Sequence, residues 1–369
     1  MKRELFIGLM SGTSIDGVDC ALVTFEDNKL ELVATHFEET TTPLRESVLK
    51  LSAGIDISLN LFGKTHVAVG IAFANAVQNL MKKTNINAED ITAIGSHGQT
   101  VWHRPLGKTP FTIQIGDANT IAQHTGITTV ADFRQRDIVL GGQGAPLAPL
   151  LHKKLFFHAQ FDRAIINIGG MANLTALPRD GKCFAYDTGP GNVLMDYWVT
   201  KHKEKRYDHD GNWGASGKCN TNLLNCLLDE PYFELKPPKS TGRELFNEHW
   251  LNSKLQKYRN PIEPNDLQAT LSLFTATSIA NALKDFCSNS EVYICGGGSH
   301  NKLLMQNIKD LVPDSIVRTT QELGVDPDWV ESITFAWLAK QTIEGRPVST
   351  CEFTGALEPS ILGGIYKSR

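Results

Sequence analysis

Several common signatures are absent from this sequence, and each absence excludes a class of protein. Lysine and arginine form no block in the 369 residues and the formal net charge is −4, so the basic stripe of a nucleic-acid-binding protein is missing. No apolar run approaches the length of about 18 residues that a membrane-spanning helix needs. We therefore expect neither nucleic acid nor a membrane as a partner.

The cysteine and histidine patterns exclude further classes of protein. The seven cysteines are odd in number and contain no Cys-x-x-Cys pair, which argues against a disulfide framework and a cysteine-built zinc site. The eleven histidines include no His-Glu-x-x-His pair, so none is assigned to zinc. The first apolar run breaks at Ser11 and no Ala-x-Ala cleavage site follows. Reduced thiols without a secretion signal predict a cytoplasmic protein.

The usual nucleotide-binding motifs are missing too. PLGKTP and ASGKCN contain Gly-Lys but lack the earlier glycine of a P-loop, and no strand-like run leads into G-x-G-x-x-G at the start of a helix. Neither a P-loop nor a Rossmann site is expected. Residues 208–212, DHDGN, resemble the start of a calcium loop, but the glutamate at its last position is absent, so we interpret them as a solvated loop.

The chain is longer than single hydrophobic cores usually grow, so two domains facing a cleft are expected. Apolar runs of strand type alternate with helical patterns such as residues 65–83, which indicates an α/β protein. The Gly/Pro-rich segment 141–149 is compatible with a hinge near residues 131–145. The last twenty or so residues are expected to return to the first domain as a helix.

Three turns built of small residues follow strand-like runs, at positions 11–19, 169–173 and 296–299. Their backbone N–H groups are uncovered, which lets a protein of low charge hold phosphates, although each could also be only a tight turn. The first is about nine residues long, where a simple hairpin loop needs two to five. Residues 163–177 share the design of the opening hairpin. This repeat predicts two related domains and a bipartite phosphate site.

This layout resembles the sugar kinase, actin and Hsp70 ATPase superfamily. The segments GLMSGTSIDGVDCAL, GSHGQTVWH, NIGGMANLT, DTGPGNVLMD and CGGGSHN together resemble the anhydro-N-acetylmuramic acid kinase family, from residue 7 to about residue 331. The resemblance implies two ribonuclease-H-like domains flanking an ATP cleft, and a homodimer. We expect an N-terminal domain of residues 1–132 plus about 350–369, and a C-terminal domain of residues 133–349.

The resemblance also implies a reaction. ATP and Mg²⁺ would serve to phosphorylate O6 of 1,6-anhydro-N-acetylmuramic acid while water opens the anhydro bond, giving N-acetylmuramic acid 6-phosphate and ADP in peptidoglycan recycling and amino-sugar catabolism. Two alternatives stay open. A non-hydrolytic sugar kinase would use its base on a substrate hydroxyl, and a nucleotide-switched protein of the actin or chaperone kind would need extra surfaces for which this chain leaves little room.

Hydrolysis of the anhydro bond needs a general base, and a carboxylate suits an oxocarbenium-like transition state. Asp187 is the candidate, because it ends a strand before a Gly-Pro-Gly turn and the family's catalytic aspartate falls on this DTGPGN motif; it could also be a turn or cap carboxylate. The resemblance places a second acid, assisting at the sugar, at Glu331, although the first turn of a helix favours acids anyway. Asp328 is expected to cap that helix.

Without a P-loop lysine, charge neutralisation is left to backbone amides and Mg²⁺. Asp16 and Asp19 are the candidate partners of the metal or its waters, and could equally be turn residues. The third turn would lie against the adenosine. The residues expected to bind the nucleotide are Gly12, Thr13, Ser14, Ile15, Asp16, Gly17, Val18, Asp19, Asn167, Gly169, Gly170, Gly189, Gly191, Gly296, Gly297 and Gly298.

Sugar recognition should use polar planar groups. Arg134 offers a bidentate fork for the lactyl carboxylate. A lone histidine such as His97 is more often structural than a ligand. The residues expected to bind the sugar are Ser96, His97, Gln99, Trp102, Asp117 and Arg134.

Overall fold

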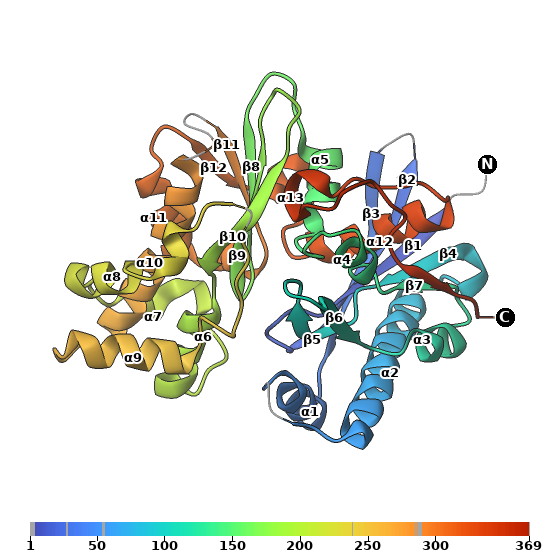
Figure 1. Ribbon diagram of the computed structural model, residues 1–369, viewed down its shortest axis with the longest axis horizontal. Coiled ribbons are helices and arrows are strands. Elements are labelled where there is room, and N and C mark those ends of the chain that lie inside the picture. Colours follow the sequence, from blue (N-terminus) through green and yellow to red (C-terminus); the bar gives the residue numbers. More distant parts are fainter. Residues whose placement is uncertain are drawn as a thin grey trace. The chain divides into compact units, whose positions relative to one another are not determined.

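The computed structural model describes residues 4–26, 29–53, 56–237, 239–284, 286 and 290–368 (Figure 1). It divides the chain into a first unit, Met1–Leu151 with Trp329–Arg369, and a second unit, His152–Asp328. Cys287 lies outside the described residues, and the cysteines within them are all free thiols. Among the described helices, none combines the length and the hydropathy needed to cross a membrane.

The first unit is built on a sheet in the order β13-β7-β4-β1-β2-β3, beside a small β5-β6 hairpin. β1, β2 and β3 form an antiparallel meander, β4 and β7 run parallel to β1, and β13 closes the edge antiparallel to β7. The strands are β1 (Leu5–Met10), β2 (Gly17–Glu26), β3 (Lys29–Glu39), β4 (Ile91–Ser96), β5 (Gln99–Arg104), β6 (Phe111–Ile115), β7 (Thr129–Ala131) and β13 (Gly364–Tyr366).

Helices cover this first sheet. In α2 the apolar positions repeat at helical spacing, the Ser58 side chain accepts the Leu61 N–H at its start, and Asn85 ends it in the left-handed conformation. β1 is buried along its whole length, as expected for a central strand. The helices are α1 (Thr42–Ser52), α2 (Leu59–Thr84), α3 (Ala118–Thr125), α4 (Gln135–Val139), α12 (Val330–Ile343) and α13 (Cys351–Thr354), with a short 3₁₀ turn at Ala88–Asp90 and α5 (Ala148–Phe156) leading into the second unit.

The second unit repeats the same plan. Its sheet has the order β10-β9-β8-β11-β12, with β8, β9 and β10 antiparallel and β11 and β12 parallel to β8. In both sheets the first strand is therefore central, with a meander on one side and parallel strands on the other. This confirms the expectation of two related α/β domains of ribonuclease-H-like type. The strands are β8 (Arg163–Ile168), β9 (Met171–Leu177), β10 (Phe184–Pro190), β11 (Glu291–Cys295) and β12 (Ile316–Thr319).

The helices of the second unit enclose its largest apolar cluster, in which the long helix α10 contributes residues from nearly every turn. α10 is accordingly buried on most of its circumference. The helices are α6 (Val193–Lys203), α7 (Asn212–Ala215), α8 (Thr221–Leu228), α9 (Glu248–Tyr258), α10 (Pro264–Lys284) and α11 (Lys302–Leu311), with 3₁₀ turns at His209–Gly211, Pro231–Glu234, Gly297–His300 and Thr320–Leu323.

Helix α12 packs on β1 and β4 more closely than any side chain would allow. A Cβ placed on Gly8 would lie 1.7 Å from the carbonyl oxygen of Ser332, and one placed on Gly95 would lie 1.9 Å from that of Phe335. Gly8 and Gly95 are direct neighbours across the two strands. Because this contact ties α12 to the first sheet, α12 belongs to the first unit, whereas we expected it in a C-terminal domain of residues 133–349.

The connections between the units also differ from expectation. The chain passes from one unit to the other at residues 151–152 and 328–329. The expected hinge near residues 131–145 contains α4, whose buried Asp137 accepts hydrogen bonds from the Gly144 amide at 2.6 Å and the Thr354 hydroxyl at 2.8 Å. These bonds fasten the glycine-rich segment inside the first unit.

Two expectations for the C-terminal region are wrong. The final segment returns to the first sheet as strand β13, not as a helix, because it extends the edge left open by β7. Asp328 does not cap α12: the cap position is Trp329, and the Asp328 carboxylate instead bonds His300 at 2.8 Å within the second unit.

Gly95→Ala should lower the unfolding temperature by roughly 2–12 °C, because the new methyl group forces α12 away from the sheet at a cost of about 1–3 kcal/mol. Gly63→Ala is the control, since Gly63 lies in α2 with nothing near its Cβ position. That change should leave the temperature equal or slightly higher. Thermal unfolding followed by circular dichroism measures both, and equal temperatures for the two variants would contradict the packing argument.

Candidate active site

The loop between β1 and β2 is six residues long, from Ser11 to Asp16, because Gly17 already pairs with Glu39 in the sheet. Its bend depends on Ile15, a β-branched residue held at φ 55° with its side chain buried in the first unit's core. This conformation is costly for such a residue, so it indicates a loop whose shape is imposed by its surroundings.

Gln99, the first residue of β5, contacts this loop through its side chain. Its amide nitrogen donates to the Gly12 carbonyl at 3.2 Å, and its amide oxygen accepts from the Ser11 hydroxyl at 2.7 Å. The side chain is buried, and the His97 amide donates to the Leu9 carbonyl beside it. The structure therefore brings the expected phosphate loop and the expected sugar turn together, and Gln99 joins them.

His97 orients Arg134. Nδ1 of His97 lies 2.8 Å from the Gly98 carbonyl and therefore donates to it, which leaves Nε2 to accept from Arg134 Nε at 3.0 Å. Burial, and next the Arg134 charge, hold the pKa of His97 well below its ordinary value, so the ring is neutral. Arg134 also donates to the Gly144 carbonyl at 2.7 Å. The guanidinium is thus fixed from two sides.

Of the remaining sugar candidates, Asp117 and Trp102 have structural contacts, and the Ser96 hydroxyl has none in the part of the chain that the structure describes. Asp117 caps α3 by accepting the Thr120 amide at 3.0 Å, and although burial raises its pKa, the hydrogen bonds from Thr120 outweigh burial and lower it. The Arg104 guanidinium lies 4.8 Å from the Trp102 ring centroid. The Ser96 hydroxyl is buried and has no hydrogen-bond partner among the described residues.

Glu331 stands in the first turn of α12, next to the Ser332 carbonyl that rests on Gly8. Gly8 and Gly95 lie near the ends of β1 and β4, which are parallel and therefore finish at the same edge of the sheet. The first turn of α12 accordingly lies near the strand ends that carry the Ser11–Asp16 loop and Ser96. The structure places this expected second acid in the first unit.

In the second unit, the turn at Gly169 and Gly170 is bonded to the start of α6. The Gly191 amide donates to the Gly170 carbonyl at 2.9 Å, and the Asn192 amide donates to the Gly169 carbonyl at 2.8 Å. A Cβ on Gly191 would lie 2.4 Å from the Gly169 oxygen. Two motifs far apart in the sequence therefore form one glycine-built surface.

The third glycine turn joins the same surface. Gly296 has φ 78°, and a Cβ there would lie 2.4 Å from Oδ1 of Asn167 at the end of β8. A Cβ on Gly298 would lie 2.3 Å from the Ile168 side chain. Of the second-unit residues expected at the nucleotide, Gly169, Gly170, Gly191, Gly296 and Gly298 are thus neighbours around the end of β8, between the start of α6 and the 3₁₀ turn Gly297–His300.

Asp187 lies in this neighbourhood. Asn167, Asn173 and Asp187 are direct partners across β8, β9 and β10, so their side chains share one face of the sheet. The register of β10 shifts immediately after Asp187, and Gly189 follows with φ 146°. A β-bulge of this kind re-aims side chains next to active sites. Oδ1 of Asn173 is buried and has no hydrogen-bond partner within the described residues.

Sequence reasoning missed the groups that hold Asp187. The Thr241 amide donates to Asp187 Oδ2 at 2.9 Å, the Tyr232 hydroxyl donates to the Asp187 carbonyl at 2.5 Å, and the Asp187 amide donates to the Lys239 carbonyl at 3.2 Å. The only local signal was the polar run Lys239–Gly242 after two prolines.

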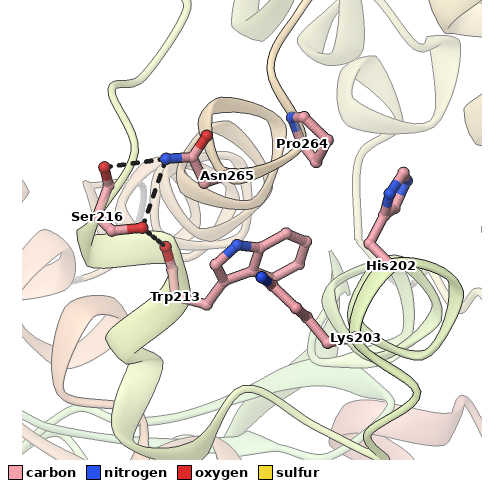
Figure 2. Close-up of a pocket in the computed structure, with 6 residues that line it drawn as sticks. All are labelled: His202, Lys203, Trp213, Ser216, Pro264 and Asn265. Atoms are coloured by element: carbon pink, nitrogen blue, oxygen red, sulfur yellow. Dashed lines mark hydrogen bonds between the residues drawn. The ribbon is translucent and has the colours of Figure 1, made fainter.

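A pocket of about 380 Å³ lies elsewhere in the second unit (Figure 2). Asn265 Nδ2 donates to the Ser216 carbonyl at 3.0 Å, and the Ser216 hydroxyl donates to the Trp213 carbonyl at 2.7 Å. The Lys203 ammonium lies 5.2 Å from the Trp213 ring centroid. The polar side chains of Ser216 and Asn265 are already hydrogen-bonded within the pocket, which makes it a weaker ligand site than the glycine-built surface. It is lined by His202, Lys203, Trp213, Ser216, Pro264 and Asn265.

The neighbouring segment Asp208–Asn212, expected to be solvated, is partly packed. The Asp208 carboxylate accepts the Trp213 amide at 2.9 Å and the Gly214 amide at 2.8 Å. Gly211 is buried, with Asn301 where its Cβ would be. The segment therefore lies against the start of α11, next to the third glycine turn.

For a metal ion the first unit offers Asp16 and Asp19. Within the part of the chain that the structure describes, no group of three or more His, Cys, Asp or Glu side chains could hold a metal. Asp16 ends the loop, whereas Asp19, which we expected on the loop, lies in strand β2 opposite Met10. Mg²⁺ bound with a nucleotide usually takes one or two carboxylates together with phosphate oxygens, so Asp16 and Asp19 are donors of the kind that it prefers. Oδ1 of Asp16 also accepts the Ser14 hydroxyl at 2.8 Å.

Comparison with known proteins identifies related chains. A family model described as anhydro-N-acetylmuramic acid kinase matches residues 4–368. The protein of that name from Coxiella burnetii is 50% identical over 99% of this chain and 98% of its own, and that from Saccharophagus degradans is 47% identical over 99% and 100%. Among solved structures, the activator of 2-hydroxyisocaproyl-CoA dehydratase from Clostridium difficile with bound ADPNP covers 92% of this chain and 97% of its own, with 14% identity and a TM-score of 0.47.

Stability should fall as the pH is lowered from 7 to 5. Burial lowers the pKa of His97, lowers that of His103 to about 4 and lowers that of His152 to about 3. Below pH 6.5 these three histidines therefore bind protons in the unfolded chain but not in the folded chain. Each histidine contributes a loss of about 2 kcal/mol in total between pH 7 and pH 5, because the slope approaches 1.4 kcal/mol per pH unit only well below pH 6.5. His103→Gln should remove the contribution of one histidine from the pH dependence of the free energy of unfolding. Unfolding temperatures that stay constant from pH 7 to pH 5 would show that these histidines titrate normally.

Proposed function

Because the chain belongs to the anhydro-N-acetylmuramic acid kinase family, we propose that it opens the 1,6-anhydro bond of 1,6-anhydro-N-acetylmuramic acid with water and transfers the γ-phosphoryl group of ATP to O6. The products are N-acetylmuramic acid 6-phosphate and ADP. The observation that carries this proposal is the identity of about half the residues with relatives of that name, over nearly the whole length of both chains.

In the proposed mechanism Asp187 is the general base. It takes a proton from water, the water oxygen bonds to the anomeric carbon, and the bond from that carbon to O6 breaks with its electron pair passing to O6. O6 then bonds to the γ-phosphorus, and ADP leaves. The position of Asp187 on the sheet face of Asn167, at a bulge beside the glycine turns, supports this assignment.

In this proposal, named residues of the chain bind the lactyl carboxylate, the phosphates and Mg²⁺. Arg134, held rigidly by His97 and the Gly144 carbonyl, would bind the lactyl carboxylate, with Glu331 assisting at the sugar. Backbone amides of the Ser11–Asp16 loop and of the Gly169 turn would hold the phosphates. Asp16 and Asp19 would hold Mg²⁺, which when bound neutralises charge on the triphosphate. Gln99 and Asp117 would support these elements rather than touch sugar.

We further propose the cellular setting that this chemistry implies. A sugar with an internal 1,6-anhydro bridge is a product of peptidoglycan breakdown, so the reaction would serve cell-wall recycling and amino-sugar catabolism. An enzyme that uses ATP and keeps free thiols would work in the cytoplasm, as a homodimer by the family resemblance.

ADP release should be rapid with 1,6-anhydro-N-acetylmuramic acid and slow with glucose or N-acetylglucosamine. Asp187→Asn should lower kcat by about 10³-fold, because general-base catalysis contributes on this order. Asp180→Asn is the matched control, since Asp180 is an exposed carboxylate of the same unit that bonds Lys182. A coupled ADP assay measures all three proteins.

Product analysis separates the alternatives. Reaction in ¹⁸O-labelled water should place the label at the anomeric carbon, whereas a non-hydrolytic sugar kinase would incorporate none. ATP turnover that no sugar accelerates would instead favour a nucleotide-switched binding protein and refute the proposed reaction.

A further inference from the structure

Asp187 is part of a closed ring of hydrogen bonds. Its amide donates to the Lys239 carbonyl at 3.2 Å, the Lys239 ammonium donates to the Tyr232 carbonyl at 3.2 Å, and the Tyr232 hydroxyl donates to the Asp187 carbonyl at 2.5 Å. A fourth bond, from the Thr241 amide to Asp187 Oδ2 at 2.9 Å, reaches the carboxylate itself. The backbone amide, the backbone carbonyl and one carboxylate oxygen of Asp187 are therefore bonded to three residues of one segment, Tyr232, Lys239 and Thr241.

The charge of Lys239 adds a second kind of contact to this ring of hydrogen bonds. Its ammonium lies 4.7 Å from the ring centroid of Tyr232 and 5.6 Å from that of Tyr186, the residue that precedes Asp187. Both distances are within the range of cation–π attraction. Burial, and next the nearby Asp187, raise the pKa of Tyr232, so its hydroxyl keeps its proton and stays a donor. The segment is thus locked to strand β10 by neutral and charged contacts.

From this geometry we infer that Tyr232, Lys239 and Thr241 are positioning residues for the catalytic carboxylate, with the Thr241 backbone amide setting the direction of the Asp187 carboxylate. The inference rests on the proposed role of Asp187 as general base. Because one oxygen is anchored at Oδ2, rotation of the carboxylate is restricted and the direction of Oδ1 is set. A misplacement of about 1 Å at such a group costs about 10²-fold in rate.

The amide of Thr241, not its side chain, makes this contact. The Thr241 hydroxyl is buried and has no hydrogen-bond partner among the residues that the structure describes. Removing the hydroxyl alone should therefore leave Asp187 in place. Replacing Thr241 by proline removes the N–H and with it the bond to the carboxylate. The two substitutions at one position separate the backbone bond from side-chain packing.

The test compares Thr241→Pro with Thr241→Ala, and Tyr232→Phe with Tyr258→Phe, in the sugar-dependent ADP assay. Tyr258 is a matched control, because its hydroxyl also donates a hydrogen bond in the same unit, to Asn220 at 3.0 Å. We expect kcat to fall about 10²-fold in Thr241→Pro and about 10-fold in Tyr232→Phe. KM for ATP should stay unchanged, and Thr241→Ala and Tyr258→Phe should retain the parent kcat within about twofold.

The pH profile distinguishes positioning from a general loss of structure. A carboxylate that loses a donor holds its proton more tightly, so the acid limb of kcat/KM should move to higher pH in Thr241→Pro. Tyr232→Phe gives an independent answer through kcat if the proline variant does not fold, which its unfolding temperature would reveal. Parent kcat in Tyr232→Phe, or a kcat loss in Thr241→Pro with an unmoved acid limb, would overturn the inference.

Failure of the inference and failure of the proposed function give different results. If Asp187→Asn is inactive while these variants behave like the parent, Asp187 is the base but the segment does not position it. If Asp187→Asn retains activity, the assignment of the base is wrong and the inference is overturned with it.

Discussion

Backbone-to-backbone contact at glycine is the constraint on which both units depend. In the first unit, Gly8 and Gly95 let α12 rest on the two central strands, and this contact places Glu331 near the strand ends. In the second, Gly191 and Gly296 let separate turns converge on the end of β8. Any side chain at these positions would hold the elements apart. The repeated sheet supplies the frame, and the missing Cβ atoms determine how closely the functional segments approach it.

The sequence predicted what is locally encoded. Helical spacing located α2, and the repeated hairpins indicated two related sheets. The catalytic role given to Asp187 from the DTGPGN motif stays a prediction. The sequence could not assign α12 to the first unit, because that depends on a close approach between segments more than 200 residues apart. It also missed Tyr232 and Thr241, which lie 45 and 54 positions from Asp187; each of the two hydrogen bonds has a backbone atom at one end, the Asp187 carbonyl for Tyr232 and the Thr241 amide for the carboxylate. Backbone contacts of this kind leave little trace in residue type.

Both units hold a positively charged side chain in a fixed position by contacts with neutral groups. A chain of net charge −4 that is to bind anionic groups needs its positive partners fixed in place rather than numerous. Arg134 is held by a histidine that burial keeps neutral, so the histidine adds no second positive charge beside the guanidinium. Lys239 is held over two aromatic rings. In the second unit, the glycine turns present peptide dipoles instead of ammonium groups.

The insertion of one unit within the other has a consequence for synthesis. The second unit is one uninterrupted segment, His152–Asp328, so its core can close as soon as that segment has left the ribosome. The first unit remains without α12 and β13 until residues 330–366 have been translated, and it exposes Gly8, Gly95 and an open sheet edge until then. During synthesis the second unit would therefore fold before the first, although the first unit's sheet begins earlier in the chain. The first unit could complete its fold only after α12 had been made.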